Sequence, residues 1–530
     1  MSQARSNVFK LRDIVNVKDP AFGAKGDGVT DDTAAIQAAI DACAFGQTLY
    51  APTGLYKHTG LTVAKSIKIV GDLPAHQFDN DSFNALNGGT RFWQSASTGN
   101  NVTVSPPNLG DRRIQVNLEN LLLIGAKYNG TDLTGTPTSG SGLVVDGRQQ
   151  AETAVHLTMR NVFSSYHKDH GFSITGAVYG SHSGFLAANG NGKNNFRIVG
   201  QSDPVGEFSV EHLRCFAGGA DGATDIEKAG IYVSSGSTFK FGFITSSGAL
   251  GAAMMLGGGA YEIGTLHSET PGGTPGATHV IFQAGDGTSN PTAAMVRRFD
   301  CSPGTNYVGT TLKVKNGARR VRVDQFTVND VVDTSGTGKH IEFESGAESC
   351  VVRGLSVATS GGDVLKVTDT DGDNYVETLH PAFFAFMSAQ MANATGDSTQ
   401  VVVAFDTVTT PGFDISSSFN TSTYLFTAPI AGVYRFEAMV QFSGADGVNH
   451  TNFGIILDKN SGTTVASNEL RLVPTLYFAQ VAATLKLTKG DTLRVKAYAE
   501  GGGKTVEVGN ISSAAAYFSG ALITPGLGNF

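Results

Sequence analysis

The sequence predicts an all-β protein in which a β-helix is followed by a separate domain of antiparallel strands. The first observation is the composition. The 530 residues include 67 Gly and 32 Phe, and only 16% are charged, which is typical of short strands joined by tight turns. The second observation is an irregular repeat over residues 142–376. The third is the end of that repeat, after which a different strand pattern begins.

A helix is expected ahead of the repeat. The stretch GAKGDGVTDDTAAIQAAIDAC places glycines and acids before a small apolar stripe of helical spacing. It lacks the lysine position of a Walker loop and the final glutamate of a calcium loop. Asp31 or Asp32 can instead accept hydrogen bonds from the free amides of a first helical turn. We therefore predict a capped helix at Thr33–Ala44.

Each unit of the repeat opens with an alternating strand, as in GLVVDG, HGFSITG and AGIYVSSG. Most units contain a second element of the pattern apolar, any, any, apolar. The second elements are Met159–Val162, Val210–Leu213, Phe241–Ile244, Ile263–Leu266, Val296–Phe299, Val323–Phe326 and Val352–Leu355. Two strand patterns in fixed order with variable insertions are typical of a β-helical solenoid, whereas a large β-sandwich, the alternative, does not keep such an order. A solenoid needs a cap on its first coil, and the predicted helix would supply it.

The stretch FGAKGDGVTDDTAAIQAAIDAC…LYAPTGLYKHTGLTVAKSIKIVGD resembles the N-terminal signature of the pectate-lyase-like, right-handed β-helix superfamily. This form is common in bacteriophage tailspikes and in polysaccharide-cleaving enzymes. The resemblance implies a right-handed parallel β-helix over residues 19–376 and a polysaccharide substrate. It implies no catalytic residues, because members of the superfamily do not share them.

Residues 377–530 are predicted to form the second domain, and about residues 382–526 of it resemble another family. The segment FTAPIAGVYRFEA (Phe426–Ala438), the KGD at Lys489–Asp491 and the closing FSGALI are similar to the globular head of complement proteins and to the tumour necrosis factor jelly roll. The resemblance implies a C-terminal antiparallel jelly roll and a homotrimer. An independent carbohydrate-binding module is the alternative.

Charge and termini argue against several partners. The formal net charge of −8 and the lack of a basic tract disfavour nucleic acid. No apolar run is long enough to span a bilayer, so we expect no membrane insertion. The start MSQARSNVFK lacks the apolar region of a signal peptide, which predicts synthesis in a reducing cytosol without general secretory export.

No cofactor and no metal site is predicted. The cysteines have no paired spacing, so they indicate neither zinc nor disulfides and are interpreted as small buried hydrophobes. They are Cys43, Cys215, Cys301 and Cys350. The stretch TDTDGDN (Asp369, Asp371 and Asp373) has oxygen ligands for calcium, but its glycine is misplaced for an EF-hand loop, and we interpret it as an acidic hinge.

Alignment of the second elements predicts columns of side chains on successive coils. The residues that follow the last apolar position are Arg214, Thr245, His267, Asp300, Thr327 and Ser356. Two residues further lie Phe216, Ser247, Glu269, Ser302 and Asn329. The column between them is small or apolar and should point inward: Cys215, Ser246, Ser268, Cys301, Val328 and Val357.

Alternation then turns Arg214, His267, Glu269 and Asp300 outward on nearby coils. Glycoside cleavage needs one carboxylic acid to protonate the leaving oxygen and one carboxylate to activate water or attack the sugar, about 5–9 Å apart. We predict that Glu269 and Asp300 are this catalytic pair. His267 and Arg214 are predicted to bind substrate or to shift the pKa values of the pair. A solvated ladder of charges is the alternative.

Two other groups of residues compete as sites. Glu211, Arg297 and Asp324 share a neighbouring column and can be read as surface ion pairs. The insertion GGADGATDIEKAG is a long loop, where binding residues often lie, and its Asp225 and Glu227 are predicted to contact substrate. A polar solvated loop is the alternative.

The stretch SSYHKDHG contains Tyr166, His167, Lys168 and His170. It offers a base and a phenol of the kind that β-elimination on a uronic acid uses. No matching column of arginines is visible in the sequence, which counts against this hypothesis.

Together these features predict a trimeric phage tailspike that binds and depolymerises a bacterial capsule, exopolysaccharide or O-antigen by endo-glycosidic hydrolysis. Residues 1–18 are expected to attach to the phage tail or an adaptor protein, and the protein would be made in the host cytoplasm and act in the virion at the host surface. A polysaccharide lyase, a non-catalytic receptor-binding fibre and a bacterial enzyme exported by a non-classical route are the alternatives.

Overall fold

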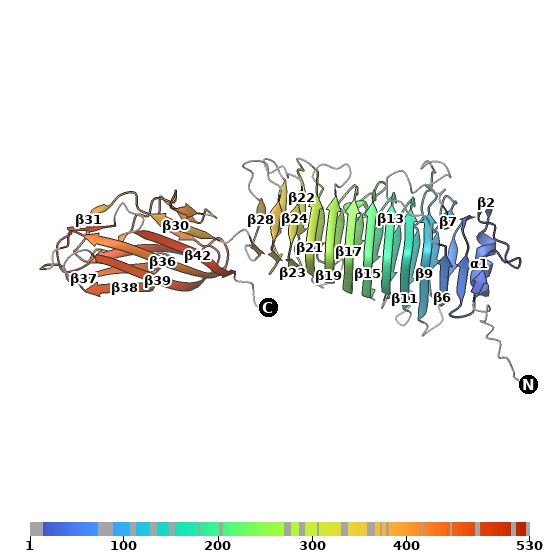
Figure 1. The fold of residues 1–530 in the computed structure, drawn as a ribbon, viewed down its shortest axis with the longest axis horizontal. Coiled ribbons are helices and arrows are strands. Elements are labelled where there is room, and N and C mark those ends of the chain that lie inside the picture. Colours follow the sequence, from blue (N-terminus) through green and yellow to red (C-terminus); the bar gives the residue numbers. More distant parts are fainter. Residues whose placement is uncertain are drawn as a thin grey trace, which may run out of the picture. The chain divides into compact units, whose positions relative to one another are not determined.

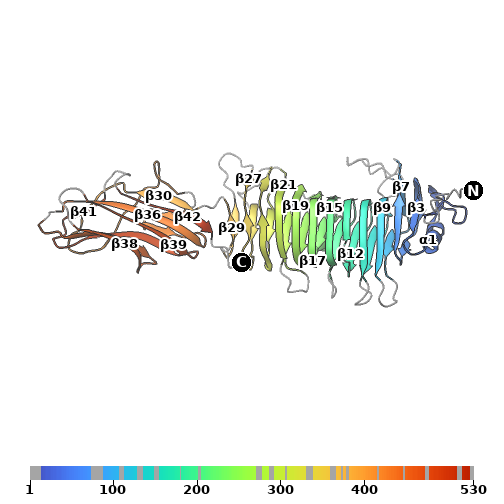
Figure 2. The same ribbon diagram turned by 60° about the horizontal axis from the view of Figure 1, so that its bottom comes forward.

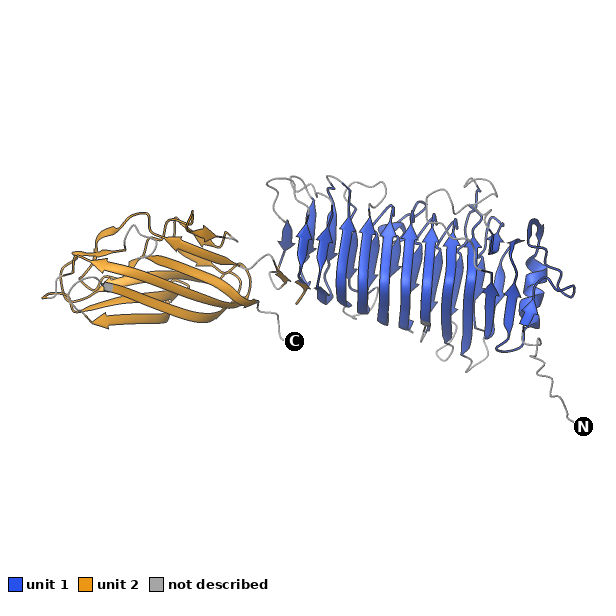
Figure 3. Ribbon diagram, in the orientation of Figure 1, with its two compact units in different colours: residues 1–347, 352–370 blue, residues 348–351, 371–530 orange. Residues whose placement is uncertain are grey.

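A computed structural model of the protein describes residues 14–72, 88–106, 113–127, 135–147, 154–178, 181–200, 205–269, 277–285, 292–304, 307–329, 338–357, 366–371, 374–377, 381–414, 417–445, 448–471, 477–509 and 516–525. The chain divides into two compact units (Figure 3). The first is Met1–Ala347 with Val352–Thr370, and the second is Glu348–Val351 with Asp371–Phe530. This division lies close to the domain boundary predicted after residue 376.

The first strand of every predicted unit lies in one parallel sheet, which we call the short-strand sheet. Its strands follow one another in sequence order, and those among the described residues are β5 Leu61–Val63, β8 Val102–Val104, β10 Leu143–Gly147, β12 Phe172–Gly176, β14 Phe196–Val199, β16 Ile231–Val233, β18 Met254–Gly257, β20 Val280–Gln283, β22 Thr310–Val314, β25 Lys339–Phe343 and β28 Val367–Asp369.

The second elements lie in another parallel sheet, the long-strand sheet. Its described strands are β1 Ile14–Asn16, β2 Asp27–Asp31, β3 Thr48–Ala51, β4 Gly54–His58, β6 Ile67–Gly71, β7 Thr90–Gln94, β9 Ile114–Ile124, β11 Val155–Ser165, β13 Ser181–Asn189, β15 Val205–Phe216, β17 Gly236–Ser247, β19 Gly259–Glu269, β21 Thr292–Ser302, β23 Ala318–Val323, β24 Phe326–Val328, β26 Val351–Val352, β27 Leu355–Val357 and β29 Tyr375–Val376. Figures 1 and 2 show the strands stacked in sequence order, from blue at the first coil to yellow at the last. The predicted parallel β-helix is confirmed.

The N-terminal helix is α1, Thr33–Ala42, and it ends two residues before the predicted limit because Cys43 adopts an extended conformation. Ile36, Ala39 and Ile40 are buried, and α1 lies at the N-terminal end of the stack (Figure 1). Packing of this apolar face, rather than capping, holds the helix, since its N-cap residue makes no side-chain cap hydrogen bond.

The two candidate capping acids have different roles. Asp31 Oδ1 accepts a hydrogen bond from the Thr33 amide at 2.9 Å, as predicted for the first turn. Asp32 instead accepts hydrogen bonds from the amides of Lys25 at 2.7 Å and Gly26 at 2.9 Å. The acid at the start of the helix therefore secures the glycine-containing loop before it.

β1 lies at the end of the predicted attachment segment, residues 1–18, and it already pairs with β3. Residues 1–13 of that segment lie outside the described residues.

Aromatic side chains stack inside the coils. The rings of Phe239 and Tyr261 lie 4.9 Å apart on adjacent coils, and those of Phe299 and Phe326 lie 4.8 Å apart. The four cysteines are buried and unbonded, which confirms their interpretation as core residues. Among the described residues, no helix is long and apolar enough to cross a membrane.

The second unit consists of two antiparallel sheets, as predicted for a jelly roll. Its described strands are β30 Ala382–Phe386, β31 Met391–Thr395, β32 Val401–Val402, β33 Phe413–Asp414, β34 Phe419–Asn420, β35 Leu425–Thr427, β36 Gly432–Ser443, β37 Asn452–Lys459, β38 Thr463–Arg471, β39 Tyr477–Leu487, β40 Thr492–Ala499, β41 Val506–Val508 and β42 Tyr517–Pro525. Phe383, Phe426 and Phe436 contribute to its buried core. The homotrimer stays a prediction.

Candidate functional site

The long strands bend in the middle, and the bend divides their outer face into two halves. In β15 the alternation of buried and exposed residues breaks at Glu211 and His212, which are both exposed. In earlier coils the bend is formed by Asn120 and Asn161, which have left-handed φ values of 57° and 54°. Asparagine tolerates this conformation, and the Asn161 amide donates to the Asn120 side chain at 3.0 Å. The bend therefore repeats from coil to coil.

The predicted columns follow the observed strand register in the second half of this face. Arg214 pairs with Thr245, Thr245 with His267, and His267 with Asp300. Asp300 in turn pairs with Thr327. The intervening column is turned inward, since its first members, Cys215, Ser246, Ser268 and Cys301, are fully buried. The outward orientation of the candidate residues is thereby confirmed.

His267 lies between the two predicted catalytic carboxylates. Its Nε2 is 2.9 Å from Glu269 Oε1, and its Nδ1 is 3.5 Å from Asp300 Oδ2. The side chain of Glu269 is 48% exposed, whereas those of His267 and Asp300 are 21% and 17% exposed. One imidazole ring thus separates two carboxyl groups that come from adjacent coils.

Asp300 is held more firmly than Glu269. The Asn329 amide donates to Asp300 Oδ1 at 2.9 Å, and the Arg298 guanidinium lies 3.3 Å from Asp300 Oδ2. Among the described residues, His267 is the polar partner of the Glu269 side chain, while the Glu269 backbone pairs with Ser302. Because Asp300 is fixed from three sides, it suits a role that needs a set orientation, while Glu269 is free to approach a ligand.

Arg214 does not touch this group. It lies in the same column as His267, but the coil of β17, with Thr245, separates them. Two strand spacings correspond to about 10 Å. Arg214 can therefore contact a neighbouring part of an extended ligand, but it cannot act on the same sugar ring by direct contact with Glu269.

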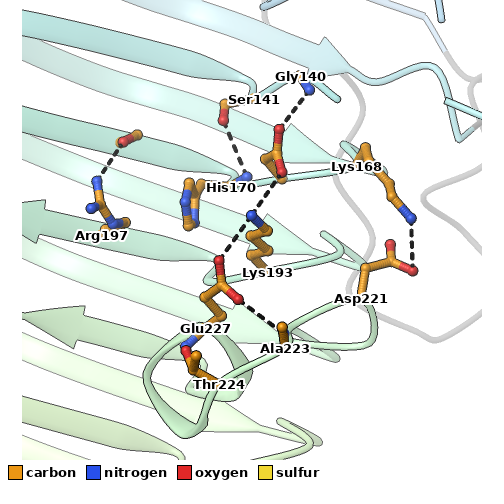
Figure 4. A network of polar contacts seen from close by, with 12 residues as sticks. Gly140, Ser141, Lys168, His170, Lys193, Arg197, Asp221, Ala223, Thr224 and Glu227 are labelled. Carbon is orange, nitrogen blue, oxygen red and sulfur yellow. Dashed lines mark hydrogen bonds and ion pairs between the residues drawn. The ribbon is translucent and has the colours of Figure 1, made fainter. Parts of the chain in front are cut away.

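The structure does not bring Asp225 and Glu227 to this group. Both lie on the short helix α2, Asp225–Lys228, in a loop near the short-strand sheet, and Asp225 is exposed. Glu227 is tied to Lys193 at 2.9 Å and to the Ala223 amide at 2.9 Å (Figure 4). The hydrogen bond from Lys193, followed by that from Ala223, lowers the pKa of Glu227. Their predicted role in substrate binding would require a separate site.

The residues of SSYHKDHG divide into structural and surface groups. His167 is buried, its Nε2 lies 3.2 Å from the Leu123 carbonyl oxygen, and burial lowers its pKa to about 3. Lys168 pairs with Asp221 at 3.1 Å (Figure 4). Neither is placed to act as a catalytic base.

His170 has cationic neighbours that the sequence pattern did not reveal. Burial, and secondly the charge of Arg197, lowers the pKa of His170 to about 3, and Lys193 acts in the same direction (Figure 4). Arg197 belongs to β14 on the next coil, and its guanidinium donates to Ser173 Oγ at 3.2 Å. These residues come from separate segments, so no single stretch of sequence shows them together.

A row of aromatic side chains crosses the coils towards His267. The ring centroids of Phe163 and Phe185 are 5.5 Å apart, and those of His212 and Phe243 are 5.4 Å apart. Phe185 and His212 are 6.2 Å apart, and Phe243 and His267 are stacked at 6.5 Å. These five rings, which we call the aromatic row, end at the carboxylate pair.

The other half of the long-strand face contains a groove of about 660 Å³, which the sequence analysis did not predict. It is lined by residues of β15, β17 and β19, with His182 of β13 and Arg297 of β21 at its ends. The residues suspected of forming ion pairs with one another have other partners here. Arg297 lies 3.4 Å from Glu262, Glu211 lies 3.9 Å from His182, and Asp324 lies 2.6 Å from Arg322. A recurring glycine in the column of Glu211 was the signal that would have indicated the groove.

Within the described part of the chain, no group of three or more His, Cys, Asp or Glu residues is arranged to hold a metal ion. Asp373 of the acidic stretch TDTDGDN lies outside that part.

Comparison with protein families agrees with the two units. Residues 14–214 match the family described as rhamnogalacturonase A/epimerase, pectate lyase-like, and residues 382–523 match the C1q domain. The chain joins a pectate-lyase-like β-helix to a C1q-like domain. Its β-helix unit carries both the carboxylate pair and the groove.

Curated relatives match this chain over a short segment. Mannuronan C5-epimerase AlgE2 of Azotobacter vinelandii is 54% identical over 66 residues, which are 11% of this chain and 6% of the relative. Alginate lyase 7 of the same organism is 53% identical over 66 residues, or 8% of its length. The chain therefore spans less than a tenth of the length of either relative.

Two solved structures are similar. The A-module of Azotobacter vinelandii mannuronan C-5 epimerase AlgE4 is 16% identical and aligns with 69% of this chain and 100% of that module, with a TM-score of 0.40. The globular domain of zebrafish complement 1qA protein is 21% identical and aligns with 28% of this chain and 98% of that domain, with a TM-score of 0.20.

Proposed function

We propose that this protein binds a polysaccharide across the outer face of its β-helix and cleaves it by endo-glycosidic hydrolysis. The observation that carries the proposal is the position of His267 between the carboxylates of Glu269 and Asp300 at the end of the aromatic row. Hydrolysis of a glycosidic bond needs two carboxyl groups on opposite sides of that bond. A polymer laid across successive coils would meet both.

The contacts of the two carboxylates assign their roles. Glu269, which is half exposed and whose side chain contacts His267, donates a proton to the oxygen of the leaving sugar. Asp300, oriented by Arg298 and Asn329, accepts a proton from a water molecule whose oxygen attacks the anomeric carbon. The bond between the anomeric carbon and the leaving oxygen breaks, so the anomeric carbon gains the hydroxyl of the water and the leaving oxygen gains a proton.

The aromatic row supports the binding part of the proposal. Faces of aromatic rings offer large, rigid, apolar contact area at a low cost in conformational entropy. Phe185 and Phe243 are partly exposed, and the row extends over five coils from β11 to β19. Five coils measure about 19 Å between the first and the last strand, which is long enough for several sugar residues of an extended chain.

We further propose that the protein is a phage tailspike that acts at the bacterial surface, as a trimer attached through residues 1–18. The support is the sequence resemblance of residues 19–376 to a superfamily that is common in tailspikes, combined with a C-terminal domain of a family whose resemblance implies trimers.

A second candidate function is β-elimination on a uronic-acid polymer. It is favoured by His170, which stays neutral beside the cationic Arg197 and Lys193, and by the similarity of a short segment to an alginate lyase and to mannuronan epimerases. Cationic groups that neutralise a uronate, next to a base, are the parts such a reaction needs.

Product analysis on a panel of purified capsules and O-antigens tests these proposals. Hydrolysis should release reducing ends without ultraviolet absorbance. Release of products that absorb in the ultraviolet, as an unsaturated sugar does, would replace hydrolysis by elimination. Binding without any release of fragments would indicate a non-catalytic receptor-binding fibre and overturn the enzymatic proposal.

A further inference from the structure

We propose that the groove between His182 and Arg297 is a second glycan-binding site, and that it holds an uncharged segment of a linear glycan. The inference takes only the class of ligand from the proposed function. It does not depend on cleavage at Glu269 and Asp300, because the groove lies on the other side of the strand bend. On β19, Glu262 and Gly264 line the groove, while His267 and Glu269 follow after the bend.

The shape of the groove fits a chain. Its volume of about 660 Å³ is in the usual range for ligand sites, and a smaller hollow of about 280 Å³ adjoins it and shares His182 and Glu211. The smaller hollow reaches Arg160 on β11, and the main groove reaches Arg297 on β21. Together they cross six successive long strands in the direction of the coil axis.

The floor of the groove is bare backbone. Gly184 lies opposite Glu211 on the adjacent strand. Gly242 and Gly264 occupy the same position on the next two coils. A Cβ on Gly242 would lie 2.5 Å from the Glu211 carbonyl oxygen, and one on Gly264 would lie 2.4 Å from the Gly242 carbonyl oxygen. At Gly184 the nearest atom is 3.5 Å away, so close packing does not require glycine there. A glycine within a strand often marks close approach of a ligand, which accounts for Gly184, where packing does not.

Hydrogen-bond donors and acceptors alternate along the walls. Glu262 lies between Lys240 at 3.8 Å and Arg297 at 3.4 Å. His182 Nδ1 lies 2.6 Å from Ser209 Oγ. Sugar hydroxyl groups both donate and accept hydrogen bonds, and such a mixed set of partners can satisfy them.

The charges along the path balance, which fits a neutral polymer better than an acidic one. Three carboxylates line the groove, those of Glu207, Glu211 and Glu262, against the two cations Lys240 and Arg297, and the adjoining hollow adds Arg160. Glu262 is neutralised by both cations, which leaves Glu207 and Glu211 as exposed carboxylates without a Lys or Arg partner among the described residues. A uronate-rich chain would place like charges against them, whereas neutral hydroxyls can donate to them.

Binding measurements on the full-length protein test the proposal. The probes are hexasaccharides of cellulose, starch, laminarin and xylan, which are neutral, and an alginate hexasaccharide, which is anionic. The Glu269→Gln variant serves as the parent, so that binding is read without cleavage. We expect at least one neutral hexasaccharide to bind, and alginate to bind at least tenfold more weakly.

Substitutions of residues that line the groove test whether the glycan binds there. Glu207→Ala and Glu211→Ala should each weaken binding of the neutral hexasaccharide about tenfold. Arg319→Ala serves as the matched control, because Arg319 is exposed on β23 of the same sheet and does not line the groove. All these side chains are exposed, so the melting temperature should not change. Stronger binding of alginate, no binding of any neutral probe, or binding by both Glu variants that is as tight as in the Glu269→Gln protein would overturn the inference.

The outcome is separable from that of the proposed function. If Glu269→Gln and Asp300→Asn both cut polymer at the rate of the unsubstituted protein while Glu211→Ala loses binding, the cleavage proposal fails and the proposal of a glycan-binding groove is supported. If the amide variants lose cleavage while Glu211→Ala binds normally, the groove proposal alone fails.

Discussion

Two adjacent coils give His267 its contacts, one to Glu269 on its own strand and one to Asp300 on the next. The side chain can therefore hold both carboxylates in one arrangement. Arg214 lies on β15, two coils away from His267 on β19, so it cannot contact the two carboxylates in this way. It is suited to binding a distant part of the polymer. The geometry thus separates a positioning residue from a binding residue.

We predict that His267→Ala lowers kcat about tenfold to a hundredfold with little change in KM, because the two carboxylates lose their common partner. The pH profile of kcat should change as well. Arg214→Ala should instead raise KM. Thr327→Ala, one coil beyond Asp300 in the same column, is the control and should leave both constants unchanged. An unaltered kcat and pH profile in His267→Ala would remove its positioning role.

Three buried histidines predict that the protein loses stability in mild acid. Burial lowers the pKa of His58 to about 4 and those of His167 and His279 to about 3, from 6.5 for a free imidazole. The unfolded chain therefore binds more protons than the folded chain below pH 6.5. Each histidine's contribution is fully present above that pH and is lost towards pH 4, by about 1.4 kcal/mol per pH unit.

Thermal melting between pH 7 and pH 4.5 checks this expectation. The melting temperature should fall steadily, and His279→Asn should flatten the fall. His182→Asn, a change at an exposed histidine, should leave the slope as it is. A melting temperature that is constant over this range would contradict the assignment of neutral buried imidazoles.

At the scale of elements, α1 closes the first coil with one apolar face. Ile36→Asp or Ile40→Asp should destabilise the β-helix by roughly several kcal/mol, because a charge would be placed against the core. Ala38→Asp is the matched control on the exposed face of the same helix. Equal melting temperatures for the Ile36 and Ala38 variants would show that the helix does not serve as a cap.

The sequence was informative about coil register because buried residues anchor each strand. Leu213, Ile244, Leu266 and Phe299 occupy the same inward position on successive coils, and insertions fall outside these strands. A slip by one residue would exchange buried and exposed positions along the strand. The column from Arg214 to Asp300 could therefore be predicted correctly.

Other features depended on contacts that spacing does not report. The groove arises where glycines on neighbouring coils leave the backbone uncovered. Whether a side chain would fit at each of these glycines depends on atoms of the neighbouring coil. The pairing of Glu227 with Lys193 joins two separate segments, which precede β16 and β14 of the short-strand sheet. The sequence column already showed that Thr245 lies between Arg214 and His267. Only the strand spacing shows that Arg214 is therefore too far away to belong to the same catalytic centre.

At the scale of the whole molecule, we predict a homotrimer. The C1q-like unit exposes Phe413, Phe478 and Ile523 by 45%, 43% and 52%, and a shared interface would remove such side chains from water. Light scattering on the purified chain should give three times 55.2 kDa. A stable monomer at micromolar concentration would contradict the trimer.

The rate of polymer cleavage by Glu269→Gln and Asp300→Asn tests the central claim most directly. Each change keeps the shape of the side chain and removes its capacity to exchange a proton. Turnover should fall about a hundredfold or more in each variant, while binding of the intact polymer survives. Arg319→Ala, a change at an exposed residue of β23, serves as the control and should cut normally. If both amide variants cleave polysaccharide at the parent rate, the catalytic site lies elsewhere.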